Sequence, residues 1–306
     1  MMPTKVFVLK ISTLCALSSL FSACGGASSS SALTRPTAAS GVLSTTGAKE
    51  IILQSNNYLV RLGEMGPGMI DWHGAQLPSR YMGSGGGFPD IGTCIHTATA
   101  GATTDADNDF IPESLSLQYN CTSTDDQGNT NKITGSASST DKSATDSYGG
   151  FLMTYTGLTS LYTYNAGQTS VTAEVSARLE TTKNSNGSYT SSGDIVLNGG
   201  IDSSRSLTGF YIDASYTPEL NNLNLPSSNG TLSSISGFLK RQNLGAVPAT
   251  DYVLTVSGSN LSYGASCDNT YKDGTVTLSD GSSNVLLITY TNCITTATLN
   301  GTTVTP

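Results

Sequence analysis

The segment Val171-Thr172-Ala173-Glu174-Val175-Ser176-Ala177-Arg178-Leu179-Glu180 alternates strictly between apolar and polar side chains. A period of two is typical of a β-strand that turns one face to a core and the other to solvent. Residues 285–288, Val-Leu-Leu-Ile, are apolar at every position and fit a strand buried on both faces. Shorter alternating stretches recur at residues 115–119, 151–155, 210–216 and 276–278. The sequence therefore predicts many strands.

Polar segments rich in Gly, Asn and Asp separate these strands, and such segments favour tight turns. The predicted turns are residues 125–128, 165–167, 184–187, 229–230, 273–274 and 280–281. No helical pattern alternates with the strands, which disfavours a parallel sheet. The fold class predicted is all-β: a large antiparallel meander that forms a sandwich or a curled, partly closed barrel. A lipid-facing outer-membrane barrel shares the alternation and is the alternative.

Composition limits the function. The formal net charge of the 306-residue chain is -8, and Asp, Glu, Lys and Arg make up only 12% of it. Binding of nucleic acid needs a basic surface, so no nucleic-acid partner is expected. With only two histidines, many catalytic schemes lack a residue they need.

The N-terminus has the pattern of an export signal. Lys5 precedes, and Lys10 lies within, an apolar run over residues 6–21, which is too short for a stable membrane span. Small residues and Cys24 follow as Ser22-Ala23-Cys24, and a Gly/Ser-rich segment comes next.

Ser22-Ala23-Cys24 resembles the lipobox of bacterial lipoproteins, in which the cysteine carries diacylglycerol and, after cleavage, a further acyl chain such as palmitate. The resemblance implies a signal peptide over residues 1–23 and lipidation of Cys24. It also implies a lipid-anchored location at the bacterial outer membrane, with the membrane as partner. An ordinary signal peptide that happens to contain a cysteine is the alternative.

The remaining chain divides into two parts by composition. Residues 24–48 are rich in Ser, Ala and Thr, without apolar periodicity, and predict a flexible tether with a reach of about 25–30 Å. Residues 49–306 form the predicted β-rich domain. Residues 50–62 fit either a helix or a pair of strands, and residues 63–92 are predicted to be loop.

Four cysteines follow the lipobox: Cys94, Cys121, Cys267 and Cys293. The spacing within the first pair and within the second is nearly equal, and Asn precedes the second cysteine of each pair. Export permits disulfides, so we predict the bonds Cys94–Cys121 and Cys267–Cys293 and two related halves. Coincidental spacing is the alternative.

Residues 105–113 form an acidic stretch that is predicted to be a loop. Its sequence is Asp105-Ala106-Asp107-Asn108-Asp109-Phe110-Ile111-Pro112-Glu113. The loop resembles the calcium-binding repeat of thrombospondin type 3. Carried over, that resemblance implies calcium ligation by the side chains of Asp105, Asp107, Asp109 and Glu113 and by the carbonyl of Ile111. A solvated acidic loop without metal is the alternative.

No catalytic residue is assigned. The common nucleophile, zinc-protease and phosphate-binding motifs are absent. Trp72 and His73 fall in the predicted loop, and His96 lies near Cys94, without a partner motif. Tyrosines such as Tyr211 and Tyr216 could stack on sugar rings or pack across strands.

The function expected is that of a non-catalytic binding or structural protein of the envelope, with an envelope protein or a polysaccharide as partner. A carbohydrate hydrolase with unassigned Asp and Glu catalysts is one alternative. A carrier that encloses an apolar ligand beside Phe151, Met153 and Phe210 is the other.

Overall fold

The computed structural model describes residues 34–49, 51–52, 95–98, 106–107, 113–124, 128–146, 148–164, 169–201, 204–220, 226–243, 251–263, 267 and 270–305. In this part of the chain, thirteen strands form one sheet in which every neighbouring pair is antiparallel and the spatial order follows the sequence. The strands are β1 (Ile95–Ala98), β2 (Leu115–Thr124), β3 (Thr130–Asp141), β4 (Gly150–Tyr164), β5 (Thr169–Lys183), β6 (Tyr189–Ile201), β7 (Ser204–Leu220), β8 (Pro226–Asn243), β9 (Tyr252–Tyr263), β10 (Asp273–Ser279), β11 (Val285–Thr291), β12 (Ile294–Leu299) and β13 (Thr302–Thr303). The predicted all-β meander is confirmed.

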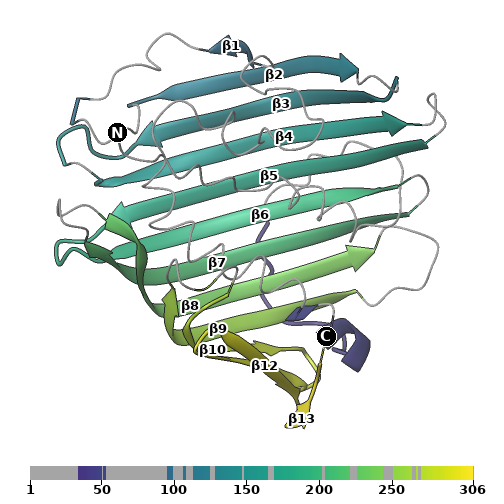
Figure 1. Cartoon of the computed structure of the whole chain (residues 1–306), viewed down its shortest axis with the longest axis vertical. Helices are drawn as coiled ribbons and strands as arrows, with labels where there is room; N and C mark the ends of the chain where they lie inside the picture. Colours follow the sequence, from purple (N-terminus) through teal and green to yellow (C-terminus); the bar gives the residue numbers. More distant parts are fainter. Residues whose placement is uncertain are drawn as a thin grey trace, which may run out of the picture.

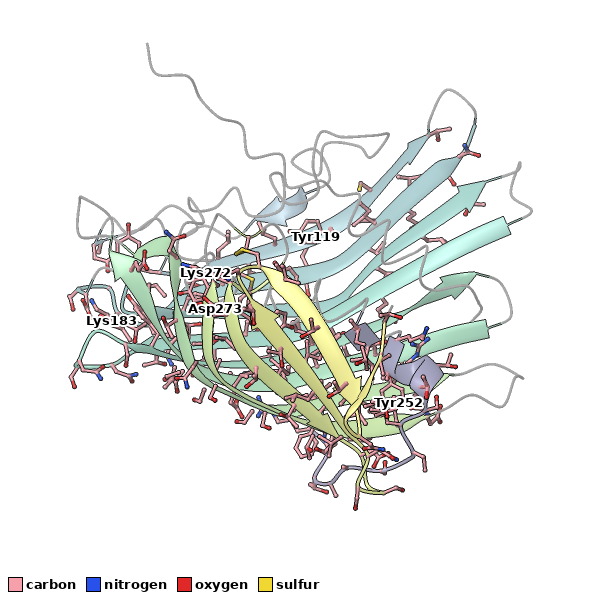
Figure 2. All side chains as sticks on the ribbon, turned by 60° about the horizontal axis from the view of Figure 1, so that its bottom comes forward. Tyr119, Lys183, Tyr252, Lys272 and Asp273 are labelled. Atoms are coloured by element: carbon pink, nitrogen blue, oxygen red, sulfur yellow. A yellow bond between two sulfur atoms is a disulfide. The ribbon has the colours of Figure 1, made fainter. Side chains whose placement is uncertain are left out.

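The sheet curls but does not close into a barrel. Strands β10–β13 turn out of the plane of the long central strands (Figures 1 and 2). Among the described strands, β1 and β13 are the two edges and do not pair with each other. A sheet must bury its apolar face against another layer, and a two-layer sandwich does so with a second sheet. Here the curl lets a single sheet bury that face against itself.

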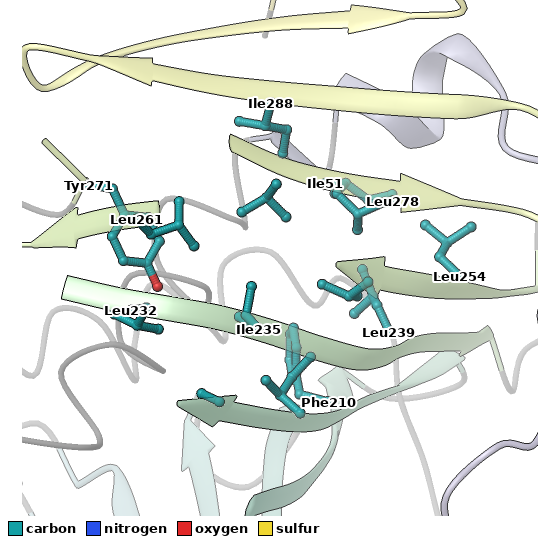
Figure 3. Close-up of a cluster of buried hydrophobic side chains, with 14 of the residues drawn as sticks. Ile51, Phe210, Leu232, Ile235, Leu239, Leu254, Leu261, Tyr271, Leu278 and Ile288 are labelled. Carbon is teal, nitrogen blue, oxygen red and sulfur yellow. The ribbon is translucent and has the colours of Figure 1, made fainter. Parts of the chain in front are cut away.

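The main core lies on the inner face of this curl. Figure 3 shows side chains of β7 and β8 facing those of β10 and β11, with Ile51 between them. Leu254, Leu278, Leu286 and Ile288 are completely buried. Burying a Leu or Ile side chain of this kind contributes about 1.5–3 kcal/mol, so the inner face is the main source of stability.

The end of the segment predicted to be a flexible tether also contributes to this core. Residues 45–49 and 51–52 are helical, and the hydroxyl of Ser44 accepts a hydrogen bond from the amide of Gly47 at 3.1 Å, which caps the first turn. Leu43, Ala48, Ile51 and Ile52 are buried in the main core. Of the two structures that fit residues 50–62, the helix therefore holds for Ile51 and Ile52. Among the described residues, no helix is long and apolar enough to cross a membrane.

Two predicted turns are wrong. Gly230 lies within β8 and Gly274 within β10. Gly230 lies against the Tyr263 ring, where a Cβ would clash, and Gly274 has a φ of 118° beside a break in the β9–β10 register. Both glycines thus serve close backbone approach rather than chain reversal. The turn at residues 300–301, Asn-Gly with φ values of 50° and 80°, joins β12 to β13 as a type I′ hairpin.

Candidate functional site

Arg35 forms a polar cluster with three side chains of β6 and β7. The Nε of Arg35 donates to Asp194 at 2.5 Å, its Nη1 donates to Asp213 at 2.5 Å, and its Nη2 donates to Ser192 at 2.8 Å. A further bond from Nη2 to Asp213 at 2.9 Å makes the contact with this carboxylate bidentate. We call this group of four side chains the Arg35 clasp.

The register of β6 and β7 builds the acceptor side of the clasp. Ser192 pairs directly with Asp213, and Asp194 pairs with Tyr211. Side chains that are paired across antiparallel strands project from the same face, so both carboxylates point to the side opposite Phe210 and Ile212 of the main core. The clasp therefore lies on the outer face of the sheet.

Electrostatics favour the charged forms of Arg35 and Asp213. Burial raises the pKa of Asp213, but hydrogen bonds from Arg35 and Ser192 outweigh it, and the net pKa lies below its usual range. Hydrogen bonding to Asp213 is the largest cause that raises the pKa of Arg35. Both carboxylates are committed to one guanidinium, an arrangement that holds chain segments together rather than one that protonates a substrate.

The chain crosses from one face of the sheet to the other just after the clasp. Ser40 exchanges two backbone hydrogen bonds of 2.9 Å with Val253 of β9, in the space beyond the end of β10. Leu43 and the helical residues then lie on the inner face. In Figure 1 this segment, drawn in purple, runs from the level of β6 to the helix near the C-terminal strands.

A buried aspartate fixes this crossing. Asp280 is 7% exposed and accepts the backbone amide of Leu43 at 2.6 Å. It also accepts the amides of Ser282 and Asn284 and the side-chain amide of Asn284 at 2.7–2.9 Å. Residues 34–48, the larger part of the segment predicted to be a tether, thus contact the sheet. Residues 24–33 lie outside the described residues.

The outer face of β8–β12 is covered by hydroxyl groups. One row of directly paired residues crosses five strands from Ser234 through Ser259, Thr275 and Thr289 to Thr296. A second row runs parallel to it: Ser236, Ser257, Thr277, Leu287 and Thr298. Neighbouring strands lie about 4.8 Å apart, so each row repeats at about this spacing. We call these ten residues the hydroxyl face.

Apolar side chains are exposed at the C-terminal end of this face. Val285 and Leu287 of β11 are 37% and 38% exposed, and Ile294 of β12 is 65% exposed. The sequence predicts that the strand over residues 285–288 is buried on both faces. In the structure Leu286 and Ile288 are buried, whereas Val285 and Leu287 are exposed on the other face. The outer face of β11 therefore combines hydroxyl and methyl groups, both open to solvent.

One disulfide prediction is confirmed. Cys267 and Cys293 are bonded, with a Cα–Cα distance of 5.3 Å. The bond fixes the β11–β12 hairpin, whose two turn residues Asn292 and Cys293 have φ values of 52° and 67°. Cys121 is also disulfide-bonded, while Cys94 lies outside the described residues.

The calcium site remains a prediction. Asp107 and Glu113 belong to the described residues, whereas Asp105, Asp109 and Ile111 do not. Within the described part of the chain, no three His, Cys, Asp or Glu side chains converge as a metal site would require. Cys24, Trp72 and His73 also lie outside that part.

The residues considered for sugar stacking and for a ligand cavity are buried. Tyr211 and Tyr216 are each 2% exposed, and the ring of Tyr216 stacks on that of Tyr189 at 5.3 Å. Phe151, Met153 and Phe210 belong to the main core. A cavity beside Met153 and Tyr155 has a volume of about 10 Å³, room for one water molecule.

The sequence patterns do not predict the Arg35 clasp, although one feature of the sequence points to it. Arg35 is the one charged residue between positions 25 and 48. Comparisons of the chain with protein-family models, curated proteins and solved structures find no match.

Proposed function

We propose that this chain is a non-catalytic lipoprotein of the bacterial outer membrane, anchored through Cys24. We propose further that the protein binds a polysaccharide through its hydroxyl face. The hydroxyl face is the observation that carries the binding proposal. The Ser22-Ala23-Cys24 motif after a short apolar run supports the anchor.

The chemistry of the hydroxyl face suits a neutral polymer of sugars. Its ten residues carry nine hydroxyl groups and no charge. Hydroxyls donate and accept hydrogen bonds, as sugar hydroxyls do, and Leu287 offers an apolar contact to the C–H groups of a sugar ring. A repeating surface across five strands matches a repeating ligand better than a small one, for which a concave pocket is the usual site.

The two alternatives find less support. Asp194 and Asp213 form a carboxylate pair on neighbouring strands, but Arg35 occupies both. A hydrolase needs one protonated and one free carboxyl group beside the bond that it cleaves. The apolar face that a carrier would need is filled by the protein's own side chains where the chain is described.

The anchor is tested by expression of the full chain in a bacterium fed labelled palmitate. Wild-type protein should incorporate the label and stay with membranes after carbonate washing, and Cys24→Ala should do neither. Membrane retention of Cys24→Ala would reject the anchor.

Binding is tested by sedimentation with insoluble neutral polysaccharides. Leu287→Lys places a charge in the centre of the hydroxyl face and should weaken binding about tenfold, or about 1.4 kcal/mol. Ser185→Lys makes a matched charge change at an exposed position of the β5–β6 turn and should bind as wild type does. Equal binding by the two variants would exclude the hydroxyl face as the site.

A further inference from the structure

The Arg35 clasp shortens the chain that connects the domain to the lipid. Composition alone assigns residues 24–48 to a tether, but four hydrogen bonds hold Arg35 against β6 and β7. Asp194 is 17% exposed, so water competes poorly for its bond to Arg35, whereas Asp213 is 49% exposed and its bonds are more open to water. Arg35 is thus the first residue after Cys24 that the structure shows bound to the sheet.

Covalent geometry then limits the distance from the membrane. Eleven residue steps separate Cys24 from Arg35. Fully extended they span about 38 Å, and the flexible Gly/Ser-rich tether that the sequence predicts would have a root-mean-square span of about 18 Å. Strand β7, with 17 residues, is about 56 Å long. Asp213 lies near the middle of β7, about 30 Å from Ser204 and about 23 Å from Leu220, so the root-mean-square span of the link is shorter than the distance to either end of the strand.

Charge gives no independent reason for contact with lipid. Lys142 and Arg178 both pair with Glu180, and Lys183 pairs with Asp146. Together with Arg35, Asp194 and Asp213 of the clasp, they make four basic groups and four acids, so the charges in these contacts cancel. Attraction to an anionic bilayer needs unpaired basic groups, so chain length and not charge determines the separation.

We propose that the region of β6 and β7 around the Arg35 clasp is the membrane-facing part of the domain, held beside the bilayer surface by the short link from Cys24. The inference rests on the proposed lipidation of Cys24. It names the partner surface, a lipid bilayer, and the part of the sheet that lies nearest to it.

Energy transfer from the protein to the membrane tests this arrangement. The full-length lipidated protein is reconstituted into phosphatidylcholine vesicles that carry an acceptor dye on the lipid headgroup. A donor dye is attached to Thr190→Cys, two residues from Ser192 on an exposed site of β6, or to Ile294→Cys on β12. Transfer should be higher from position 190 than from position 294, and adding phosphatidylglycerol should not change it.

Two variants change the length of the link. Arg35→Ala moves the first fixed residue to Ser40, which raises the number of steps from eleven to sixteen and the root-mean-square span about 1.2-fold. Insertion of eleven Gly/Ser residues after Ser30 leaves the clasp intact and raises the span about 1.4-fold. Both should lower transfer at position 190. Lys142→Ala, which breaks an ion pair outside the N-terminal segment, should not.

The outcomes separate the two proposals. Absence of lipid on Cys24 by mass spectrometry overturns the anchor and this inference together. If Cys24 is lipidated but the insertion leaves transfer at position 190 unchanged, the membrane-facing assignment is overturned while the anchor stands. Equal transfer from positions 190 and 294 in the wild type overturns it as well.

Discussion

The backbone amide of Leu43 donates a hydrogen bond of 2.6 Å to the carboxylate of Asp280, 237 residues further along the chain. This contact joins the N-terminal segment to the turn between β10 and β11. Because Asp280 also holds Ser282 and Asn284, one buried side chain orders the turn and the crossing segment together.

Replacing Asp280 by Asn should lower the free energy of unfolding by about 2 kcal/mol. An amide can accept from one side only, so its NH₂ group would face the amides of Leu43 and Asn284, which are both donors. Urea unfolding measures the loss. Asp146→Asn is the control, because this exposed carboxylate pairs with Lys183 at the surface and should matter by less than about 0.5 kcal/mol. Equal losses would show that Asp280 has no special role.

The same carboxylate should make stability depend on acid pH. Burial raises the pKa of Asp280, but hydrogen bonds from Leu43, Asn284 and Ser282 outweigh it and leave the pKa below its usual value. The folded state then binds fewer protons than the unfolded state. The stabilisation is complete above the unfolded pKa of about 3.9 and is lost as the pH falls through the folded pKa.

Unfolding free energies of wild type and Asp280→Asn should therefore differ by a constant amount from pH 7 to about 4, and should converge as the pH is lowered from about 4 to about 2. Asp213 and Glu180, whose pKa values are also lowered, keep some acid dependence in the variant. A difference between the two proteins that stays constant down to about pH 2 would contradict the linkage.

The strands could be predicted from sequence because alternation is a local property. Residues 171–180 lie in β5, and Ala177 and Leu179 are buried as the pattern requires. The exposure of Leu287 could not be predicted, since a run of four apolar residues does not show whether a second layer covers the sheet. That depends on the curl, which brings β10 and β11 over the inner face only.

The N-terminal segment could not be predicted because its partners are remote. Arg35 contacts residues 157 to 178 positions away, and the composition around it is that of a linker. Local composition indicates how strongly a segment collapses on itself, but it does not show which distant carboxylates bind a charged side chain of that segment. The isolated charge at Arg35 was the usable signal.

Loss of the Cys267–Cys293 disulfide should cost about 3.5 kcal/mol, the loop-closure value for a separation of 26 residues. The double variant Cys267→Ser/Cys293→Ser tests this in thermal or urea unfolding. Position 293 has a φ of 67°, a conformation that glycine adopts without strain. Cys267→Ser/Cys293→Gly should therefore regain about 1 kcal/mol relative to the double serine variant. No difference between the two would mean that the hairpin turn changes conformation when the bond is absent.

Gly237 should be the most sensitive glycine of the central sheet. It lies in β8 between Ile212 and Val256 with a φ of 147°, and a Cβ at this position would overlap the carbonyl oxygen of Tyr211. Gly237→Ala must shift the backbones of β7 and β8 apart, so we expect a loss of about 3 kcal/mol or more in urea unfolding. Gly187→Ala is the matched control: its φ is 80°, but nothing lies within 4 Å of an added Cβ, and its cost should be about 1 kcal/mol. If both substitutions cost the same, the φ strain alone would account for the effect, and the close approach of β7 to β8 at Gly237 would not limit stability.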